Sequence, residues 1–347
     1  MPGAISQELR CVKMRSCICA SCTLFLLPFN ETYFIMKFIN DIIRRHVATL
    51  RIIPLLAVAA VMLAACGDDD NGTSGSGSSS RLSNNANANP NTREELRLLE
   101  FPRVKGDDNN LIIVHSTAQY GINYSIEWDC QKRAQRWTCY EMHKGNNVSN
   151  WSRNNWYSTS WNGDPFQEDP DIPDMYNVTL YDHVGDGFDR GHICASQDRM
   201  CSREVNEQTF YLSNMQPQYN AFNAGIWADM EGQVRRWNRD SFRDTLYICK
   251  GGTIDKKEQI LMYSNKGLVV PKYFFMAVLC KNTEGYKAMA FWIEHTNESR
   301  KNDTLSKYVI SIDRLESMTG IDFFCNLPDD IEYKVERNVY PQSWGIK

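Results

Sequence analysis

Hydrophobic positions after residue 100 come in short runs separated by turn-forming residues. Four of these runs, 110–118 (NLIIVHSTA), 245–251 (TLYICKG), 273–280 (YFFMAVLC) and 288–295 (AMAFWIEH), are rich in β-branched and aromatic side chains. Runs of this length and composition indicate strands, and their nearly continuous apolar character indicates that several are buried on both faces.

Two segments have helical spacing instead. Within residues 226–237, apolar side chains recur at the spacing of one helix face and charged side chains occupy the other. A second, shorter helix is predicted to begin near Ser311 and to end at Gly320, where glycine provides the C-cap. Because strands and helices do not alternate regularly, and no second linker interrupts residues 97–347, we expect one α+β domain there.

A region of different composition precedes this domain. Arg44, Arg45 and Arg51 stand before an apolar run over 52–65, which is shorter than the roughly 20 residues that span a membrane. A positive flank and a short apolar region are typical of a secretory signal. The ending Leu-Ala-Ala-Cys66 resembles the lipobox of bacterial lipoproteins. Residues 36–66 are therefore expected to be a lipoprotein signal peptide with Cys66 as the lipid anchor.

The segments around that signal complete the expected organisation. Residues 67–96 are predicted to be a flexible tether, because their Gly, Ser, Asn and Asp content provides almost nothing to bury. Residues 1–35 precede Met36-Lys37, a natural start for a signal, and are interpreted as an extension from a misassigned start. The expected location is the cell envelope of a Gram-negative bacterium, as an outer-membrane lipoprotein with a periplasmic or surface-exposed body.

Charge and cysteine content limit the partners and the redox state of the domain. The whole chain has a formal charge of −4, but residues 67–347 carry 31 Lys and Arg against 39 Asp and Glu. A polyanion must therefore bind to a local basic patch. Seven cysteines follow Cys66, and an exported protein is expected to pair some of them. A Cys194–Cys201 bridge could stiffen the neighbouring loop, or an unpaired thiol could sensitise it to oxidation.

The motif Asp189-Arg190-Gly191-His192 combines an acid, a cation and an imidazole within four positions. Downstream, Asn223, Glu231 and Arg235 stand eight and four residues apart, which places them along one slowly winding stripe of a continuous helix. A simpler interpretation exists for each residue taken singly. Asn223 could cap the helix, and Glu231 could pair with Arg235 on the solvent-exposed surface. Together with the upstream motif, these residues favour a functional site.

These residue types suit hydrolysis of a phosphodiester. Mg²⁺ prefers oxygen ligands and keeps several waters, so one amide carbonyl and one carboxylate are a sufficient protein contribution. Imidazole can take a proton from water near neutral pH. Guanidinium groups match phosphate oxygens and offset the charge that develops on them.

The same residues resemble a known family. The segments DRGH (189–192), SNMQPQ (213–218) and NAGIW (223–227), followed by Glu231, are similar to the DNA/RNA non-specific endonuclease family, which is related to endonuclease G. The resemblance continues into the later strand segments and a closing element near residues 311–327. It implies a ββα-metal, or His-Me finger, fold with a central, mostly antiparallel sheet flanked by helices.

The resemblance also implies roles for individual residues. His192 would be the general base, Asn223 the direct metal ligand, and Glu231 the residue that orders the metal's waters. Arg190 would stabilise the phosphate, Arg235 would contact the departing phosphate, and Arg153 would make an upstream phosphate contact. Asn214 would orient the histidine loop. Asp189 is expected to brace the loop. His183 is expected in a surface loop, and Trp227 and Trp237 in the core.

The expected function is that of an exported, lipid-anchored endonuclease that depends on Mg²⁺, with Mn²⁺ as a possible substitute, and cuts DNA and RNA without sequence preference. Two alternatives stay open. One is a surface lipoprotein that binds nucleic acid without turnover, and the other is a nuclease restricted to DNA. The expected partners are DNA, RNA, the membrane through Cys66, and a second copy in a homodimer.

Cleavage is expected to fall markedly between ~50 and ~200 mM salt, because an acidic body must attract phosphates through a local cleft whose contacts salt weakens. The expected cleft draws on Arg190, Arg235, Arg236 and basic residues before 160. Initial rates of plasmid cleavage across that range measure the effect. A flat profile would contradict the expectation.

Overall fold

The computed structural model describes residues 84–155 and 164–346, and its centre is a seven-stranded sheet in the order β1-β2-β3-β6-β9-β10-β11. Every neighbouring pair in the sheet is antiparallel. The strands are β1 Asn110–Thr117, β2 Gly121–Asp129, β3 Ala134–His143, β6 Thr245–Gly252, β9 Tyr273–Asn282, β10 Gly285–Glu294 and β11 Val309–Ile310. The four strands predicted from the hydrophobic runs are confirmed as β1, β6, β9 and β10.

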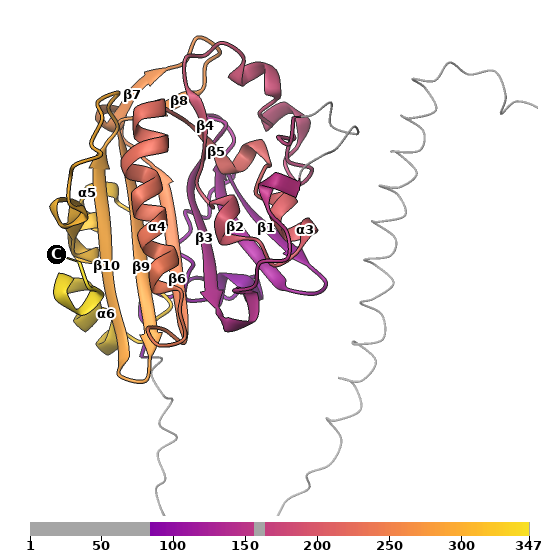
Figure 1. Cartoon of the computed structure of the whole chain (residues 1–347). Helices are drawn as coiled ribbons and strands as arrows, with labels where there is room; N and C mark the ends of the chain where they lie inside the picture. The colour runs from indigo at the N-terminus through magenta and orange to yellow at the C-terminus, as the bar shows by residue number, and fades with distance from the viewer. Residues whose placement is uncertain (1–83, 156–163, 347) are drawn as a thin grey trace, which may run out of the picture. The chain divides into compact units, whose positions relative to one another are not determined.

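Two small antiparallel pairs and a few short helices surround this sheet (Figure 1). The pairs are β4 Asp189–His192 with β5 Met215–Gln218, and β7 Ile260–Tyr263 with β8 Val269–Pro271. The helices are α3 Arg203–Gln208, the π-helical segment η9 Phe222–Trp227, α4 Ala228–Trp237, α5 Ile312–Thr319 and α6 Asp329–Arg337. Single 3-10 turns are η1 Glu94–Arg97, η2 Lys144–Asn146, η3 Arg153–Asn155, η5 Asp174–Tyr176, η6 Leu180–His183, η7 Ser196–Asp198, η8 Leu212–Asn214, η10 Lys257–Gln259, η11 Leu305–Tyr308 and η12 Pro341–Trp344.

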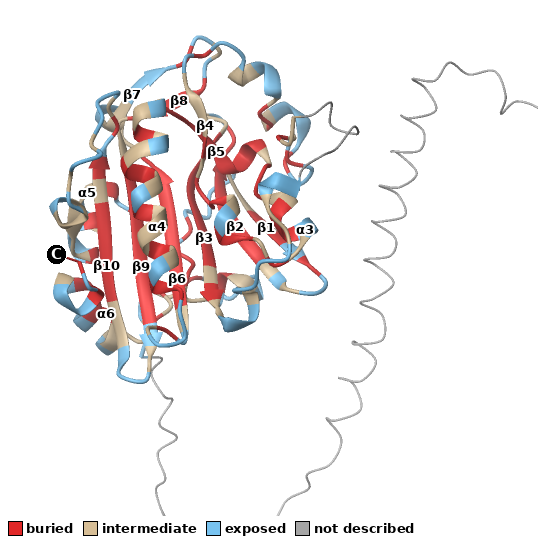
Figure 2. Cartoon of the chain, in the orientation of Figure 1, coloured by how far each residue is buried: buried red, intermediate tan, exposed pale blue. Residues whose placement is uncertain are grey.

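The sheet is buried on both faces, as the continuous apolar runs predict. In β9, Phe274 and Met276 belong to the core on one face, and Phe275 and Ala277 belong to the core on the other. Figure 2 shows the central strands buried along most of their length. Alternate side chains of a strand point to opposite faces, so one strand supplies both cores.

Different elements cover the two faces. The helix α4 packs its apolar side chains on the first face together with the β4/β5 pair. The other face is covered by α5, α6 and the N-terminal segment. The predicted helix after Ser311 is confirmed. Ser311 accepts a hydrogen bond from Arg314 N, and Gly320 adopts the left-handed conformation with φ 77° that ends α5.

The helix predicted over 226–237 is not continuous with Asn223. Gly225 interrupts it with φ −107° and ψ −115°, so a wide π-helical turn precedes α4. Asn223, Glu231 and Arg235 were expected to lie along one stripe of a continuous helix. That expectation is wrong, because the break at Gly225 separates Asn223 from the regular helix that carries Glu231 and Arg235. Trp227 consequently lies in the core, as expected, and Trp237 lies in the same core.

The domain begins earlier than the predicted tether allows. Residues 84–96 belong to the folded part, where Asn85 Nδ2 donates to Leu327 O over 2.7 Å and the buried Asn89 donates to Pro102 O over 2.9 Å. Hydrogen bonds from asparagine side chains attach this segment to the domain, and the polar composition of the segment did not indicate that it is folded. The signal, the lipobox with Cys66, and most of the tether lie outside the described residues. Among those that are described, no helix is long and apolar enough to span a membrane.

The expected disulfides are absent from the described residues. All seven cysteines of the domain are buried free thiols, including Cys194 and Cys201. Burial raises the pKa of Cys194 to about 12. These side chains act as small apolar core residues. Of the two alternatives for Cys194 and Cys201, a bridge or unpaired thiols, the structure has the unpaired thiols.

Candidate active site

The β4/β5 pair and the helix η9–α4 form the scaffold of the site. In register, His192 stands opposite Met215, and Gly191 stands opposite Gln216. The side chain of Gln218 crosses directly over Gly191, where a Cβ atom would lie 2.2 Å from Gln218 Cδ. Glycine is therefore required between Arg190 and His192 by this close approach.

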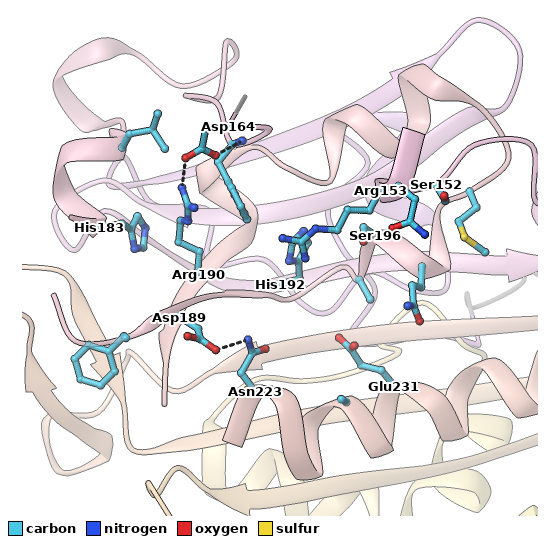
Figure 3. Close-up of a pocket in the computed structure, with 18 of the residues that line it drawn as sticks. Ser152, Arg153, Asp164, His183, Asp189, Arg190, His192, Ser196, Asn223 and Glu231 are labelled. Atoms are coloured by element: carbon cyan, nitrogen blue, oxygen red, sulfur yellow. Dashed lines mark hydrogen bonds and ion pairs between the residues drawn. The ribbon is translucent and has the colours of Figure 1, made fainter. Parts of the chain in front are cut away.

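A cavity of about 1070 Å³ opens between this scaffold and the preceding loops. Six residues with expected roles line it: Arg153, Arg190, His192, Asn223, Glu231 and Arg235. Figure 3 shows His192 and Arg153 across the cavity from Asn223 and Glu231, which come from the helix. The fold thus brings together residues separated by as many as 82 positions in the chain.

His192 presents an unpaired nitrogen at this cavity. Its Nε2 is enclosed and has no hydrogen-bond partner among the described residues. The ring packs against Phe166 and Phe210 at centroid distances of 5.7 and 5.1 Å. Burial, followed by the positive charges of Arg153 and other cations, lowers the pKa of His192 to about 3. The imidazole is therefore neutral over the physiological range and able to accept a proton.

Asn214 lies behind the histidine rather than in the cavity. Its Oδ1 accepts from Cys194 N at 2.8 Å, and its Nδ2 donates to Cys194 O and Thr209 O at 2.9 and 2.8 Å. These bonds tie the chain just after His192 to η8. The contacts agree with the expected orienting role of Asn214.

Asp189 holds Asn223 from the side. Asn223 Nδ2 donates to Asp189 Oδ2 at 3.0 Å, and Asn220 Nδ2 donates to the same oxygen at 2.9 Å. In Figure 3 the amide oxygen of Asn223 is turned to the side of Glu231. Asp189 was expected to brace a loop, and it fixes which end of the amide reaches the cavity.

A chain of alternating charges extends from Glu231 into the core. Lys250 Nζ lies 3.8 Å from Glu231 Oε1 and 3.6 Å from Asp198 Oδ2, and Asp198 accepts a hydrogen bond from Arg235 at 3.0 Å. Burial raises the pKa of Glu231 to about 7, although the Lys250 ammonium opposes that shift.

Lys250 and Asp198 were missed from the sequence. Lys250 follows Leu246 and Ile248 on the same face of β6 and is fully buried. The signal was present, because a lysine that continues an apolar alternation in a central strand requires an acidic partner. The identity of that partner depends on the fold.

The basic side chains expected in the cleft differ in the contacts that they already make within the protein. Arg190 is paired with Asp164 at 2.9 Å and stacks over Phe166 at 3.8 Å. Arg153 lies 5.7 Å from the Phe210 ring. Arg236 does not line the cavity and instead donates to Gln233 on the helix surface. The expected contribution of Arg236 to the cleft is therefore wrong.

His183 also differs from expectation. It was assigned to a surface loop, but its side chain is only 3% exposed and lines the cavity, with Nδ1 3.4 Å from Asp186 Oδ2. Its partner Asp186 is buried as well, which the sequence does not indicate.

The residues of the cavity fit a hard divalent cation. The Asn223 carbonyl and the Glu231 carboxylate are oxygen donors of the kind Mg²⁺ prefers, and Glu231 Oε1 is buried without a hydrogen-bond partner among the described residues. A different group, His115 with Asp169 and Asp171, lies away from this cavity. There one ring nitrogen lies 3.0 Å from the buried Asp169 and the other lies 3.6 Å from the exposed Asp171.

Comparisons with known proteins agree with this geometry. The family model described as DNA/RNA non-specific endonuclease matches residues 110–330. Nuclease C1 of Cunninghamella echinulata var. echinulata is 30% identical over 47% of this chain and 67% of its own length. The mitochondrial nuclease EXOG of Xenopus laevis is 27% identical over 61% of this chain and 60% of its own length. The chain thus spans about two thirds or less of these relatives.

A solved structure shows the same fold. A crystal structure of the EndoG/EndoGI complex superposes with a TM-score of 0.52 and 19% identity, over 65% of this chain and 89% of that one. The α+β fold and the central antiparallel sheet expected from the sequence are confirmed.

Gly191→Ala is expected to lower the free energy of unfolding by about 1–3 kcal/mol, because the new methyl group overlaps Gln218. Chemical denaturation measures the change. Gly232→Ala is the matched control, since its Cβ would lie 3.5 Å from the flexible end of Arg236. The control should be at least as stable as the wild type, because alanine favours a helix interior over glycine. A Gly191→Ala variant as stable as the wild type would show that β4 and β5 do not approach as described.

Acid should destabilise the protein partly through His192. Its native pKa of about 3 lies below the ordinary value of 6.5, so between these values the unfolded chain binds a proton that the native state does not. Stability from this group is full above pH 6.5 and falls as the pH decreases. His192→Gln should reduce the loss between pH 7 and pH 4 by at least ~1 kcal/mol, measured by denaturant unfolding. An unchanged pH dependence would show that His192 titrates normally.

Proposed function

Since the chain belongs to the DNA/RNA non-specific endonuclease family, we propose that it hydrolyses phosphodiester bonds of DNA and RNA without sequence preference, in a reaction that depends on Mg²⁺. One observation carries the proposal. A His192 ring nitrogen without a hydrogen-bond partner among the described residues and the Glu231 carboxylate, whose Oε1 has the Lys250 ammonium beside it, belong to the lining of one cavity with Asn223 and three arginines.

His192 acts as the general base. Its neutral ring is fixed by Phe166 and Phe210 and by the Asn214 contacts behind the strand. The free Nε2 takes a proton from a water that attacks phosphorus. The low native pKa keeps this nitrogen unprotonated before substrate binds. An anionic phosphate bound beside Arg153 and Arg190 offsets the positive charges that lower this pKa, and this favours proton transfer to the ring.

Asn223 would hold the metal directly through its amide oxygen, and Glu231 would hold it through water. When bound, Mg²⁺ or Mn²⁺ polarises the phosphate and stabilises the leaving oxygen. Asp189 orients the Asn223 amide, and Lys250 supplies a fixed counter-charge beside Glu231.

The arginines bind the phosphate. Arg190, Arg153 and Arg235 line the same cavity, and guanidinium groups match phosphate oxygens and offset charge in the transition state. Arg190 must exchange part of its pairing with Asp164 for substrate, whereas Arg235 stays anchored to the buried Asp198. Contacts to phosphate carry no base information, which supports cleavage without sequence preference.

The proposal includes export and anchoring. Residues 36–66 serve as the lipoprotein signal and Cys66 as the lipid anchor at the outer membrane of a Gram-negative envelope, with residues after it as the tether. A homodimer is compatible with this arrangement. The sequence features above support these proposals, and acyl labelling of the wild type beside Cys66→Ser tests the anchor.

The protein is expected to degrade supercoiled plasmid and a structured RNA with Mg²⁺ and to leave both intact with EDTA. His192→Ala should lose at least ~10²-fold in rate, as expected for a missing general base. His143→Ala is the matched control, because His143 is a half-buried histidine that does not line the cavity.

Two other outcomes select the alternatives. A folded wild type that binds DNA but never nicks it with Mg²⁺ or Mn²⁺ would replace the enzyme by a binding protein. Cleavage of plasmid without cleavage of RNA would restrict the substrate to DNA.

A further inference from the structure

An apolar ridge borders one side of the active-site cavity. Leu180, Tyr181 and Val184, which we call the rim, are 36%, 68% and 63% exposed. Leu180 and Val184 line the same cavity as His192, and Tyr181 lies between them in sequence, within and just after η6. Exposed apolar groups gathered at the mouth of a polar cavity are characteristic of a ligand contact.

The rim is held firmly from beneath. Thr179 N donates to Asp182 Oδ2 at 2.8 Å, and Arg133 donates to the same oxygen at 2.6 Å. His183, one residue before Val184, is buried against Asp186. These contacts fix η6, so the rim is ordered before any ligand arrives and little conformational entropy is lost on binding.

Tyr181 is also supported from the side. Lys266 Nζ lies 3.8 Å from the centre of its ring, and the neighbouring Asn265 donates to Gly185 O at 2.9 Å. A cation on the ring adds positive charge next to an exposed aromatic surface. Lys266 therefore covers one face of the Tyr181 ring, and the other face is the one on which a base can stack.

The cavity beside the rim is suited to the phosphate of a nucleotide. Arg190 and Arg153 line it as phosphate-binding groups, and His183 and Arg190 lie on the same side in Figure 3. A nucleotide joins an anionic phosphate, through its sugar, to a base with flat aromatic faces. Its two halves match the arginines and the rim in charge and in polarity.

We propose that Leu180, Tyr181 and Val184 form a subsite for an unpaired base adjacent to the phosphate being cleaved, so that single-stranded DNA and RNA bind better than duplexes. This inference rests on the proposed function. In a duplex the base faces are already stacked on one another and cannot contact Tyr181. An unpaired base can stack on the ring whatever its identity, because every base has a π-face.

Binding measured without cleavage tests this subsite. In EDTA, the fluorescence anisotropy of a labelled single-stranded oligonucleotide and of its duplex gives a Kd for each. Tyr181→Ala is expected to raise the single-strand Kd at least about fivefold, the lower end of what one stacked base contributes. The duplex Kd should change less than ~2-fold, and Tyr181→Phe should restore single-strand binding because it keeps the ring.

Tyr333→Ala is the matched control. Tyr333 is 61% exposed and has a cation over its ring, with Arg337 at 4.6 Å, but it lies on α6 and does not line the cavity. This variant should bind both substrates as the wild type does. Thermal unfolding of each variant checks that the fold is intact.

Three results would overturn the inference. They are an unchanged single-strand Kd in Tyr181→Ala, an equal loss for single strand and duplex, or unchanged binding with a shift from dimer to monomer in sedimentation, which would make the rim a subunit interface. The proposed function is judged separately, by cleavage with Mg²⁺. A protein that cuts nucleic acid without dependence on Tyr181 retains its function and loses only the subsite.

Discussion

Burial of both faces of the central sheet is the constraint on which the rest of the structure depends. The two apolar faces of β6 and β9 must each be covered. On one face α5, α6 and the N-terminal segment provide this cover. On the other face it comes from α4 and the β4/β5 pair, and this layer also carries Arg190, His192, Glu231 and Arg235, which line the cavity. His192 and Glu231 are therefore supported on a packed core, which fixes their geometry before substrate binds, whereas Arg153 and Asp164 reach the cavity from loops.

Charge buried beneath the site is the second organising feature. Lys250 is fully buried, and its ammonium is balanced by Asp198 and Glu231 at ion-pair distance. The desolvation free energy of buried charged groups is larger than that of a surface ion pair. Loss of one partner would leave the charge of the others without a counter-charge. The arrangement links Arg235 on the helix to a central strand. Glu231 and Arg235 on the helix are thereby connected to the sheet electrostatically as well as by packing.

Much of this architecture could be predicted from local pattern. The strands around Phe274 and Phe291 followed from their apolar runs, and the end of α5 at Gly320 followed from its cap. Other features were not predictable. The interruption at Gly225 depends on a backbone conformation, the burial of His183 depends on the following loop, and the packing of Asn85 and Asn89 depends on distant segments.

The sequence by itself determined the strand periodicity, the family resemblance and the set of residues with the right chemistry, because these depend on residue type and short spacing. Only the tertiary structure decided which of them meet. It placed Arg153 beside His192 and Lys250 beside Glu231, kept seven cysteines as buried thiols, and moved Arg236 away from the cavity. The physical reason is that charge, burial and hydrogen-bond partners are properties of neighbours in space. In this chain those neighbours lie many residues apart in sequence.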